Sequence, residues 1–202
     1  MAKIILIGGG SASGKTYVLK QVIAKVGAEH ITHISIDDYY KQLDMPLEER
    51  RKQNFDHPKA FDWQLLESDL KKLKNNEEID KPLYDYTVSN RKSETEHVVP
   101  KELVVVEGIM ALVNKRVRAI SDLNIFIEAS RENRLVRRIK RDQVERARSF
   151  DSIVDQYFAT VLPMYEEIIA PSQYYADFIV HNDGVKNHSI DVISAVLKSY
   201  LD

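Results

Sequence analysis

A glycine-rich segment near the start of the chain has the spacing of a phosphate-binding loop. Four of the seven glycines lie between Gly8 and Gly14, and the segment fits the pattern G-x-x-x-x-G-K-[ST]. It follows an apolar run at residues 4–7 and precedes an amphipathic stretch at residues 18–26, which is the strand and helix context that the motif requires. Successive backbone N–H groups of such a loop converge on one anion, and the start of the helix adds partial positive charge. The residues of the predicted loop are Gly9, Gly10, Ser11, Ala12, Ser13, Gly14, Lys15 and Thr16.

The last two residues of the motif predict what the loop binds. Lys15 would neutralise the β- and γ-phosphate oxygens of a nucleotide, and the Thr16 hydroxyl would hold Mg²⁺. The alternative is a glycine-rich turn with a chance lysine, which the complete motif and its flanks disfavour. The motif therefore predicts binding of a nucleoside triphosphate, but it does not predict which reaction follows.

Acidic residues follow two apolar runs that are expected to be strands. Asp37 and Asp38 end the run at residues 31–36, and Glu107 ends the run at residues 103–106. Ligands of open α/β sheets bind beyond the carboxyl ends of the strands. One carboxylate there could organise Mg²⁺, and another could accept the proton of an attacking hydroxyl. Position favours such roles for Asp37 and Glu107, whereas a turn-forming or capping role is the simpler interpretation of Asp38.

Residues 131–148 form an arginine-rich segment. It holds eight basic and three acidic residues, a local charge of +5 in a chain whose formal net charge is −2. Several arginines recur three or four residues apart, so their charges share one side of a helix. Three interpretations remain: a lid over a transferring phosphoryl group, a solvated helix face, and a nucleic-acid stripe. Composition alone favours the solvated face, and the acidic total disfavours the nucleic-acid stripe.

The elements that must position these residues alternate along the chain. Short β-branched runs at residues 3–7, 31–36, 103–106, 123–127 and 178–180 predict buried parallel strands. Apolar residues at helical spacing lie between them, which predicts an α/β sheet with helices on both faces. Residues 79–99 instead alternate apolar and polar residues around a polar stretch at residues 89–92, which predicts an inserted antiparallel hairpin that turns there.

Composition limits the class of protein. The 202 residues fit one domain, residues 1–202, and 44% apolar residues suffice for a substantial core. The chain has no cysteine, which excludes a disulfide framework and a thiol nucleophile. No apolar run approaches the roughly 18 residues of a membrane helix. We therefore expect a cytoplasmic protein that binds neither membranes nor nucleic acids.

Seven motifs, taken in order, resemble the uridine–cytidine kinase family of P-loop kinases. They lie at residues 9–16, 35–40, 54–58, 82–86, 91–92, 106–109 and 137–148. The resemblance covers nearly the whole chain and implies a P-loop NTPase fold, a nucleoside-binding hairpin at about residues 79–99 and an arginine-rich lid at about residues 131–150. It also implies that the γ-phosphoryl group of ATP, or GTP, is transferred to the 5′-hydroxyl of uridine or cytidine in the presence of Mg²⁺. By the same resemblance the chain is a homo-oligomer, a tetramer.

The resemblance also implies roles for individual residues. Asp37 is similar to the base that takes the 5′-hydroxyl proton, and Thr16 and Glu107, with Asp37 nearby, are similar to the magnesium site. Asp56 and Arg138 match the pair that holds the ribose hydroxyls. The residues that match the walls of the family's nucleoside pocket are Tyr40, Phe55, Tyr84 and Tyr86. Gln156 matches the family's glutamine that reaches the nucleoside. The residues that match the lid arginines are Arg141, Arg146 and Arg148.

Two positions depart from the pattern of the resembled family. Ser89 stands where the family often has a histidine that contacts the pyrimidine edge, and Ala147 stands where its Glu-Arg-Gly-Arg run has glycine. Ser89 leaves base preference open, because a hydroxyl is shorter than an imidazole and carries no charge. Ala147 predicts a stiffer lid hinge. A kinase of another small hydroxyl metabolite and a regulatory NTP-binding protein with weak transfer activity remain as alternatives.

Overall fold

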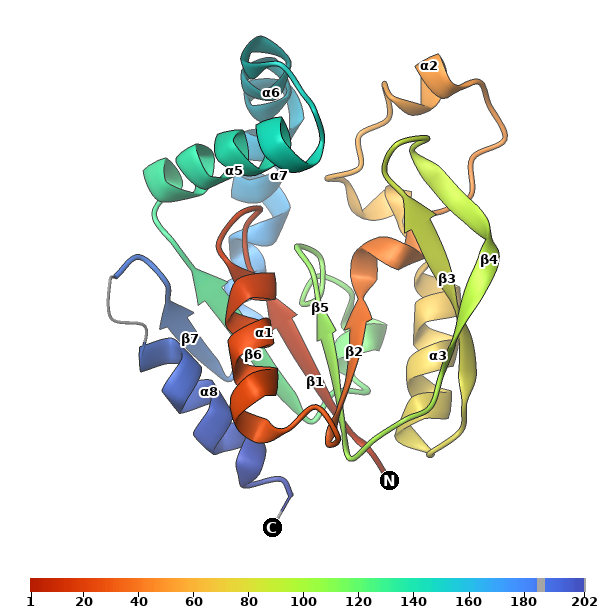
Figure 1. The fold of residues 1–202 in the computed structure, drawn as a ribbon, viewed down its shortest axis with the longest axis vertical. Coiled ribbons are helices and arrows are strands. Elements are labelled where there is room, and N and C mark those ends of the chain that lie inside the picture. Colours follow the sequence, from red (N-terminus) through yellow and green to blue (C-terminus); the bar gives the residue numbers. More distant parts are fainter. Residues whose placement is uncertain (185–187, 202) are drawn as a thin grey trace.

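Five parallel strands form the central sheet, in the order β2-β5-β1-β6-β7 (Figure 1). They are β1 (Lys3–Gly8), β2 (Ile31–Ser35), β5 (Leu103–Glu107), β6 (Leu123–Glu128) and β7 (Phe178–His181). The computed structural model describes residues 1–184 and 188–201; of the predicted domain, residues 185–187 and 202 lie outside this description. The predicted strands are confirmed, each differing by one residue at its carboxyl end.

Alternation along β1 divides the core between the two faces of the sheet. Ile4 and Leu6 point to one face and Ile5 and Ile7 to the other, and all four are fully buried. The face with Ile5 and Ile7 is covered by the adjacent helices α1 (Lys15–Val26) and α8 (His188–Lys198). The other face is covered mainly by α3 (Trp63–Lys74) and α4 (Lys115–Arg118). The predicted three-layer α/β arrangement is confirmed.

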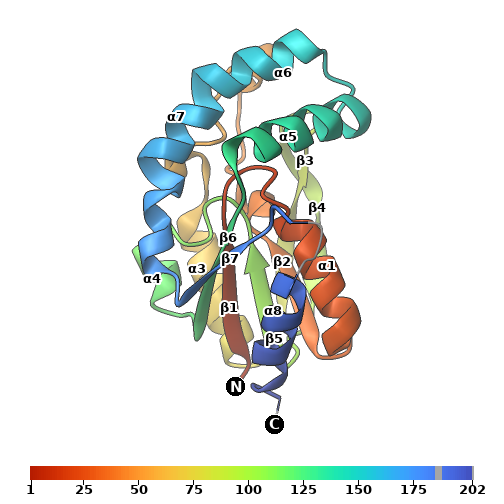
Figure 2. The same cartoon turned by 90° about the vertical axis from the view of Figure 1, so that its left-hand side faces the viewer.

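The remaining helical segments lie between or after these elements. They are η1 (Ile36–Tyr39), α2 (Leu47–Arg50), η2 (Pro58–Ala60), α5 (Arg131–Glu145), α6 (Phe150–Gln156), η3 (Tyr157–Val161), α7 (Leu162–Met164), η4 (Tyr165–Ile169) and η5 (Pro171–Tyr175). Figure 2 shows α5 and α6 lying across the carboxyl end of the sheet, with the helical run through α7 descending along one side. Within the described ranges, no helix combines the length and the hydropathy that crossing a bilayer requires.

The predicted hairpin is confirmed as a separate two-stranded sheet of β3 (Ile79–Asp85) and β4 (Asn90–Val98). Its predicted turn is wrong, because the chain reverses at residues 86–89 and not at residues 89–92. Ser89 closes the turn with a φ of 49°.

Two residues of the expected turn are fixed in β4 by distant partners. The Asn90 side chain accepts a hydrogen bond from the Leu43 backbone N–H at 2.9 Å. Arg91 lies 3.3 Å from the Asp62 carboxylate. Because both partners lie far away in the sequence, the local polar pattern, which is typical of a turn, does not show that Asn90 and Arg91 belong to β4.

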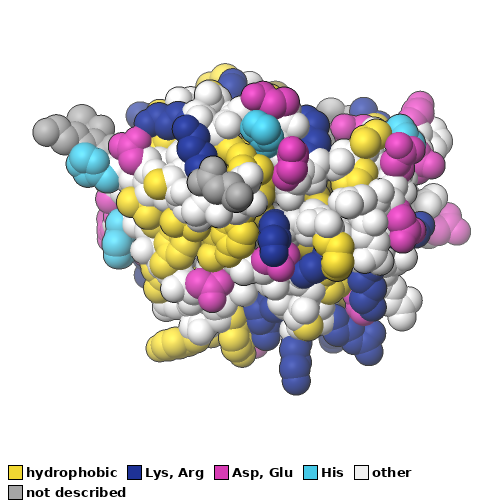
Figure 3. All heavy atoms as spheres, turned by 90° about the horizontal axis from the view of Figure 1, so that it is seen from below, with side chains coloured by type: hydrophobic (Ala, Val, Ile, Leu, Met, Phe, Trp, Pro, Cys, Tyr) yellow, Lys and Arg dark blue, Asp and Glu magenta, His cyan; other side chains and the backbone are white. Residues whose placement is uncertain are grey.

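The two ends of the molecule differ in charge pattern. Figure 3 shows the end away from α5, where Lys and Arg side chains are interspersed with Asp and Glu. The described chain ends lie toward the same end (Figure 1). The arginine-rich α5 lies at the opposite end, over the carboxyl ends of the strands.

Candidate active site

The loop between β1 and α1 is fixed by glycines with no room for a side chain. Gly9 has a φ of 144° and Gly14 a φ of 92°, which L-residues with side chains rarely adopt. A Cβ atom on Gly9 would lie 2.3 Å from the Ile127 carbonyl oxygen, and one on Gly14 would lie 2.2 Å from the Asn182 side-chain nitrogen. The loop therefore packs tightly against β6 and the segment after β7.

Lys15 is held beneath this loop. Its ammonium is buried and donates hydrogen bonds to the carbonyl oxygens of Gly9 at 3.0 Å and Gly10 at 2.9 Å. Burial lowers the pKa of Lys15 to about 8, while the carboxylates of Glu107 and Asp37 oppose that shift. A buried cation next to a loop suited to phosphate binding fits an anionic ligand that would compensate its lost hydration.

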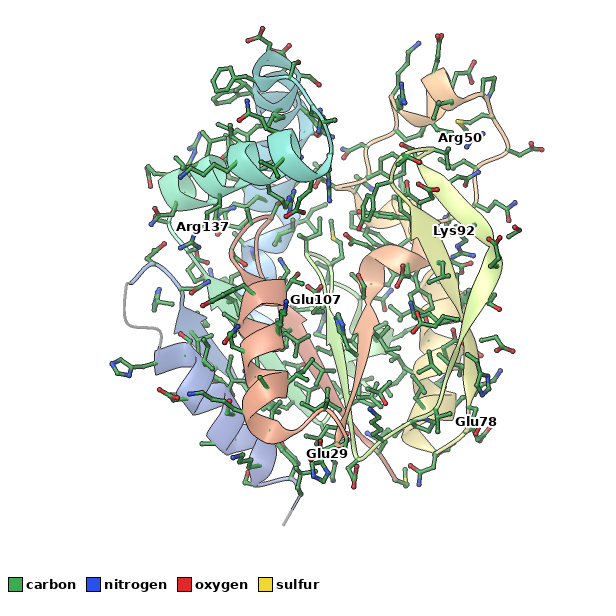
Figure 4. The ribbon with its side chains drawn as sticks, viewed as in Figure 1. Glu29, Arg50, Glu78, Lys92, Glu107 and Arg137 are labelled. Carbon is green, nitrogen blue, oxygen red and sulfur yellow. The ribbon has the colours of Figure 1, made fainter. Side chains whose placement is uncertain are left out.

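Thr16 and Glu107 form an oxygen-donor pair at the adjoining strand ends. The Thr16 hydroxyl donates to Glu107 Oε1 at 3.1 Å, and His33 Nε2 lies 3.9 Å from the same oxygen. Figure 4 labels Glu107 beside the start of α1. Among the described residues, no three His, Cys, Asp or Glu side chains form a metal cage. The hard oxygen donors fit Mg²⁺ in its usual protein setting of one or two carboxylates plus phosphate oxygens.

Asp37 lies in η1, directly after β2. Its Oδ2 accepts a hydrogen bond from the Tyr86 hydroxyl at 2.9 Å, and its Oδ1 is buried without a hydrogen-bond partner among the described residues. Burial and the nearby Glu107 carboxylate raise the pKa of Asp37, while the Tyr86 hydrogen bond partly opposes the shift. A carboxyl group with a raised pKa and a free acceptor oxygen suits proton transfer.

Aromatic rings from three segments form one wall beside Asp37. The ring centroid of Tyr40 lies 5.2 Å from that of Phe55 and 4.9 Å from that of Tyr84. Tyr84 in turn lies 5.2 Å from Tyr86. Phe61, which the sequence analysis missed, packs 4.4 Å behind Tyr40. The four predicted wall residues are therefore brought together.

Arg138 reaches the phosphate-binding loop. Its guanidinium donates to the Ser11 hydroxyl at 2.8 Å and to Gln156 Oε1 at 2.9 Å. The Asp56 side chain is nearly buried, which raises its pKa, and the charge of Arg138 opposes that shift. Arg138 thus links the loop to Gln156 and lies near enough to Asp56 for their charges to interact.

The arginine-rich helix α5 turns its charged side toward the loop. Arg134 is buried, donates to the Ala129 carbonyl oxygen at 3.0 Å and stacks 3.6 Å from the centroid of the Tyr165 ring. Arg137 donates to the Asn182 carbonyl oxygen at 2.8 Å, and Figure 4 labels it on α5. A fully solvated face is therefore wrong for this helix.

One cleft of about 1260 Å³ collects most of the predicted residues. Those that line it are Ser11, Ala12, Gly14, Lys15, Thr16, Asp37, Tyr40, Phe55, Asp56, Tyr84, Tyr86, Ser89, Glu107, Arg138, Arg141, Arg146, Arg148 and Gln156. The other predicted loop residues, Gly9, Gly10 and Ser13, do not line the cleft and are buried within the loop itself. The predicted site residues thus lie in one cleft or directly under it.

Asp38 and Lys81 are structural partners that the sequence analysis did not connect. Lys81 is buried in β3, and its ammonium lies 2.6 Å from Asp38 Oδ2 and 3.1 Å from Glu96 Oε2. Asp38 Oδ1 also accepts from the Tyr84 backbone N–H at 3.3 Å. The signal in the sequence was the position of Lys81, two residues after Ile79 and hence on the same inward face of an alternating strand.

Comparison with known proteins agrees with this geometry. Residues 4–189 match the model of the Phosphoribulokinase / Uridine kinase family. The chain is 43% identical to a uridine kinase of Ligilactobacillus salivarius over 199 residues, covering 98% of this chain and 93% of that protein. It is 43% identical to a uridine kinase of Clostridium tetani over 197 residues, covering 96% of this chain and 94% of that protein.

The fold is also similar to solved structures. Phosphoribulokinase from Rhodobacter spheroides superposes with a TM-score of 0.69 at 17% identity, over 93% of this chain and 72% of that one. At this identity the likeness shows the fold alone. The family match and the full-length relatives show more: the chain belongs to the phosphoribulokinase/uridine kinase family.

Proposed function

We propose that this chain transfers the γ-phosphoryl group of ATP, or GTP, to the 5′-hydroxyl of uridine or cytidine, giving UMP or CMP. The observation that carries the proposal is the position of Asp37 between a phosphate-binding loop and a wall of aromatic rings in one cleft. The names of the full-length relatives support the nucleoside as acceptor.

In this proposal Asp37 is the base. Its free Oδ1 accepts the proton of the 5′-hydroxyl as the hydroxyl oxygen attacks the γ-phosphorus atom. The bond between the γ-phosphorus and the bridging oxygen breaks, and the nucleoside diphosphate leaves with the electron pair. A raised pKa brings the carboxylate closer to the basicity that proton transfer near neutral pH requires.

The phosphate side of the cleft supplies positive charge. The loop amides and Lys15 hold the β- and γ-phosphate oxygens, while Arg141, Arg146 and Arg148 approach from the lid. Thr16 and Glu107 hold Mg²⁺, which when bound offsets the charge of the phosphate oxygens. These groups act chiefly by alignment and charge neutralisation.

The nucleoside side supplies orientation. The rings of Tyr40 and Tyr84 contact the planar base, and Ser89 reaches its edge. Asp56 accepts hydrogen bonds from the paired ribose hydroxyls, assisted by Arg138. Together they hold the 5′-hydroxyl toward Asp37.

The direct test is product analysis with purified protein, ATP, Mg²⁺ and each of several nucleosides. We expect stoichiometric UMP and ADP from uridine, and reduced transfer to 2′-deoxyuridine, which lacks one of the hydroxyls that Asp56 would bind. Lys15→Met should abolish transfer, whereas Lys20→Met, which alters an exposed lysine of the same helix, should leave it unchanged.

The same panel separates the two alternatives. ATP binding without transfer to any nucleoside would favour a regulatory NTP-binding protein. ADP release with another hydroxyl metabolite, and not with nucleosides, would favour a kinase of that metabolite.

A further inference from the structure

Asp142 lies at the centre of the arginine cluster of the lid. Its side chain is fully buried on α5, and its Oδ1 accepts from Arg141 at 2.7 Å and 2.8 Å. The guanidiniums of Arg138, Arg146 and Arg148 surround the same carboxylate at 3.7, 3.8 and 3.7 Å. One carboxylate therefore faces four guanidiniums.

The second oxygen of this carboxylate is buried and has no hydrogen-bond partner among the described residues. The two arginines nearest to it, Arg138 and Arg148, instead donate to Gln156 Oε1. The carboxylate thus holds one arginine directly and attracts the others without a hydrogen bond. Small shifts of Arg138 and Arg148 would complete its contacts.

Like charges at this spacing repel one another, and an anion between them offsets that repulsion. The backbone supports the same arrangement, because the Arg148 N–H donates to the Asp142 carbonyl oxygen at 3.2 Å. This contact bends the chain after α5 so that Arg146 and Arg148 return toward the helix. A single buried residue therefore organises both the charge and the path of the lid.

We propose that Asp142 is a positioning residue for phosphoryl transfer, which keeps Arg141, Arg146 and Arg148 assembled at the cleft before the triphosphate arrives. It acts through the arginines and does not contact the substrates. The inference rests on the proposed function and adds a residue to it. Pre-assembly matters because groups that are already oriented lose less freedom when the transferring group binds.

The test compares Asp142→Asn with Asp142→Glu and with Glu132→Gln. Asp142→Asn keeps the shape of the side chain and removes its charge, whereas Asp142→Glu keeps the charge. Glu132→Gln removes the same charge from an exposed residue in the first turn of α5. Each variant is assayed for kcat, for binding of a non-hydrolysable ATP analogue by calorimetry, and for tryptic cleavage after Arg146 and Arg148.

We expect Asp142→Asn to lower kcat about tenfold to a hundredfold, the scale of a misplaced catalytic group. Binding of the analogue should change less than about threefold, because the positive charge remains, although its arrangement is lost. The analogue should protect the lid of the parent protein and of Asp142→Glu from trypsin, but not the lid of Asp142→Asn. Glu132→Gln should behave as the parent.

Unchanged kcat with intact protection in Asp142→Asn would overturn the proposal. So would an Asp142→Glu variant that loses turnover and protection as fully as Asp142→Asn, because the charge would then not be what matters. If the parent transferred no phosphate to nucleosides, the proposed function would fail, and the protection assay would still report on Asp142.

Discussion

The Tyr86 hydroxyl donates a 2.9 Å hydrogen bond to the Asp37 carboxylate. The same ring lies 4.6 Å beneath the guanidinium of Arg146. One side chain at the hairpin tip therefore contacts both the proposed base and Arg146 of the proposed lid. The acceptor hydroxyl of a substrate must either bind Asp37 together with the Tyr86 hydroxyl or displace the Tyr86 hydroxyl from it.

Tyr86→Phe is expected to shift the pH dependence of the reaction. The Tyr86 hydrogen bond holds the pKa of Asp37 down against the effect of burial, so its removal raises that pKa further. At a given acidic pH less Asp37 is then ionised, and the acid limb of kcat/KM moves to higher pH. Hydrogen bonds to charged groups contribute about 1.5–3 kcal/mol, which makes the shift measurable in a pH–rate profile. Tyr174→Phe, at an exposed tyrosine of η5, should leave the limb in place, and an unmoved limb in Tyr86→Phe would contradict the assignment.

Asp37→Asn is expected to lower the turnover rate and to raise the stability of the folded protein near neutral pH. Loss of the base should lower kcat by about 10²–10⁴, measured as ADP release. Because the pKa of Asp37 is raised in the folded state, the folded state binds more protons than the unfolded state between the two pKa values. The free energy of unfolding of the parent therefore falls as pH rises through that window, and the asparagine variant lacks this fall.

The stability arm of that experiment is a pair of melting curves. The melting temperature of Asp37→Asn should exceed that of the parent at pH 7.5, and the difference should vanish below about pH 4, where the carboxyl is protonated in both states. A variant with equal melting temperatures at pH 7.5 would show that burial imposes no cost on the carboxylate.

Sequence patterns predicted the parts of this site that depend on near neighbours. The loop at residues 9–16 and the five strands follow from local spacing and from continuous apolar runs, and both are confirmed. The hairpin turn and the pairing of Asp38 with Lys81 were not predictable in the same way. They depend on contacts between segments more than 40 residues apart, such as that of Asn90 with Leu43 and that of Lys81 with Asp38.

The arginine segment shows the same limit. Helical spacing predicted that several arginines share one side of α5, but not that the side faces inward. Asp142 is one of the three acidic residues counted in the segment, and its spacing does not set it apart from Glu132 and Glu145. Its burial among four arginines depends on the return of the chain after Glu145, which no local pattern specifies.

Ala147→Gly is expected to stabilise the protein. Ala147 has a φ of 51°, a left-handed conformation that disfavours a Cβ atom by roughly 1–2 kcal/mol. Glycine removes most of this cost, although it gains freedom in the unfolded chain, so the net gain is about 1 kcal/mol or less, or up to about 4 °C in melting temperature. Ala24→Gly, in the exposed interior of α1, should have the opposite sign and lose about 1 kcal/mol. A destabilised Ala147→Gly variant would mean that the left-handed conformation at residue 147 is not strained.

Lys81→Met is expected to loosen the hairpin that presents Tyr84. The substitution leaves the Asp38 carboxylate without its 2.6 Å partner next to Asp37, at an expected cost of about 2 kcal/mol in the free energy of unfolding. Because Asp38 also holds the Tyr84 backbone, the KM for the nucleoside should rise more than the KM for ATP. Denaturant unfolding and initial-rate kinetics measure the two effects.

Two further variants separate the pairing from a general loss of charge. Lys92→Met removes an exposed lysine from β4 of the same hairpin and should change neither quantity appreciably. Adding Asp38→Asn to Lys81→Met removes the unpaired carboxylate and should restore part of the lost stability, since an unpartnered charge costs more than a missing pair. The double variant could instead lose as much unfolding free energy as Lys81→Met and Asp38→Asn lose when their separate effects are added. Lys81 would then stabilise the hairpin by packing, and it would not position Tyr84 through Asp38.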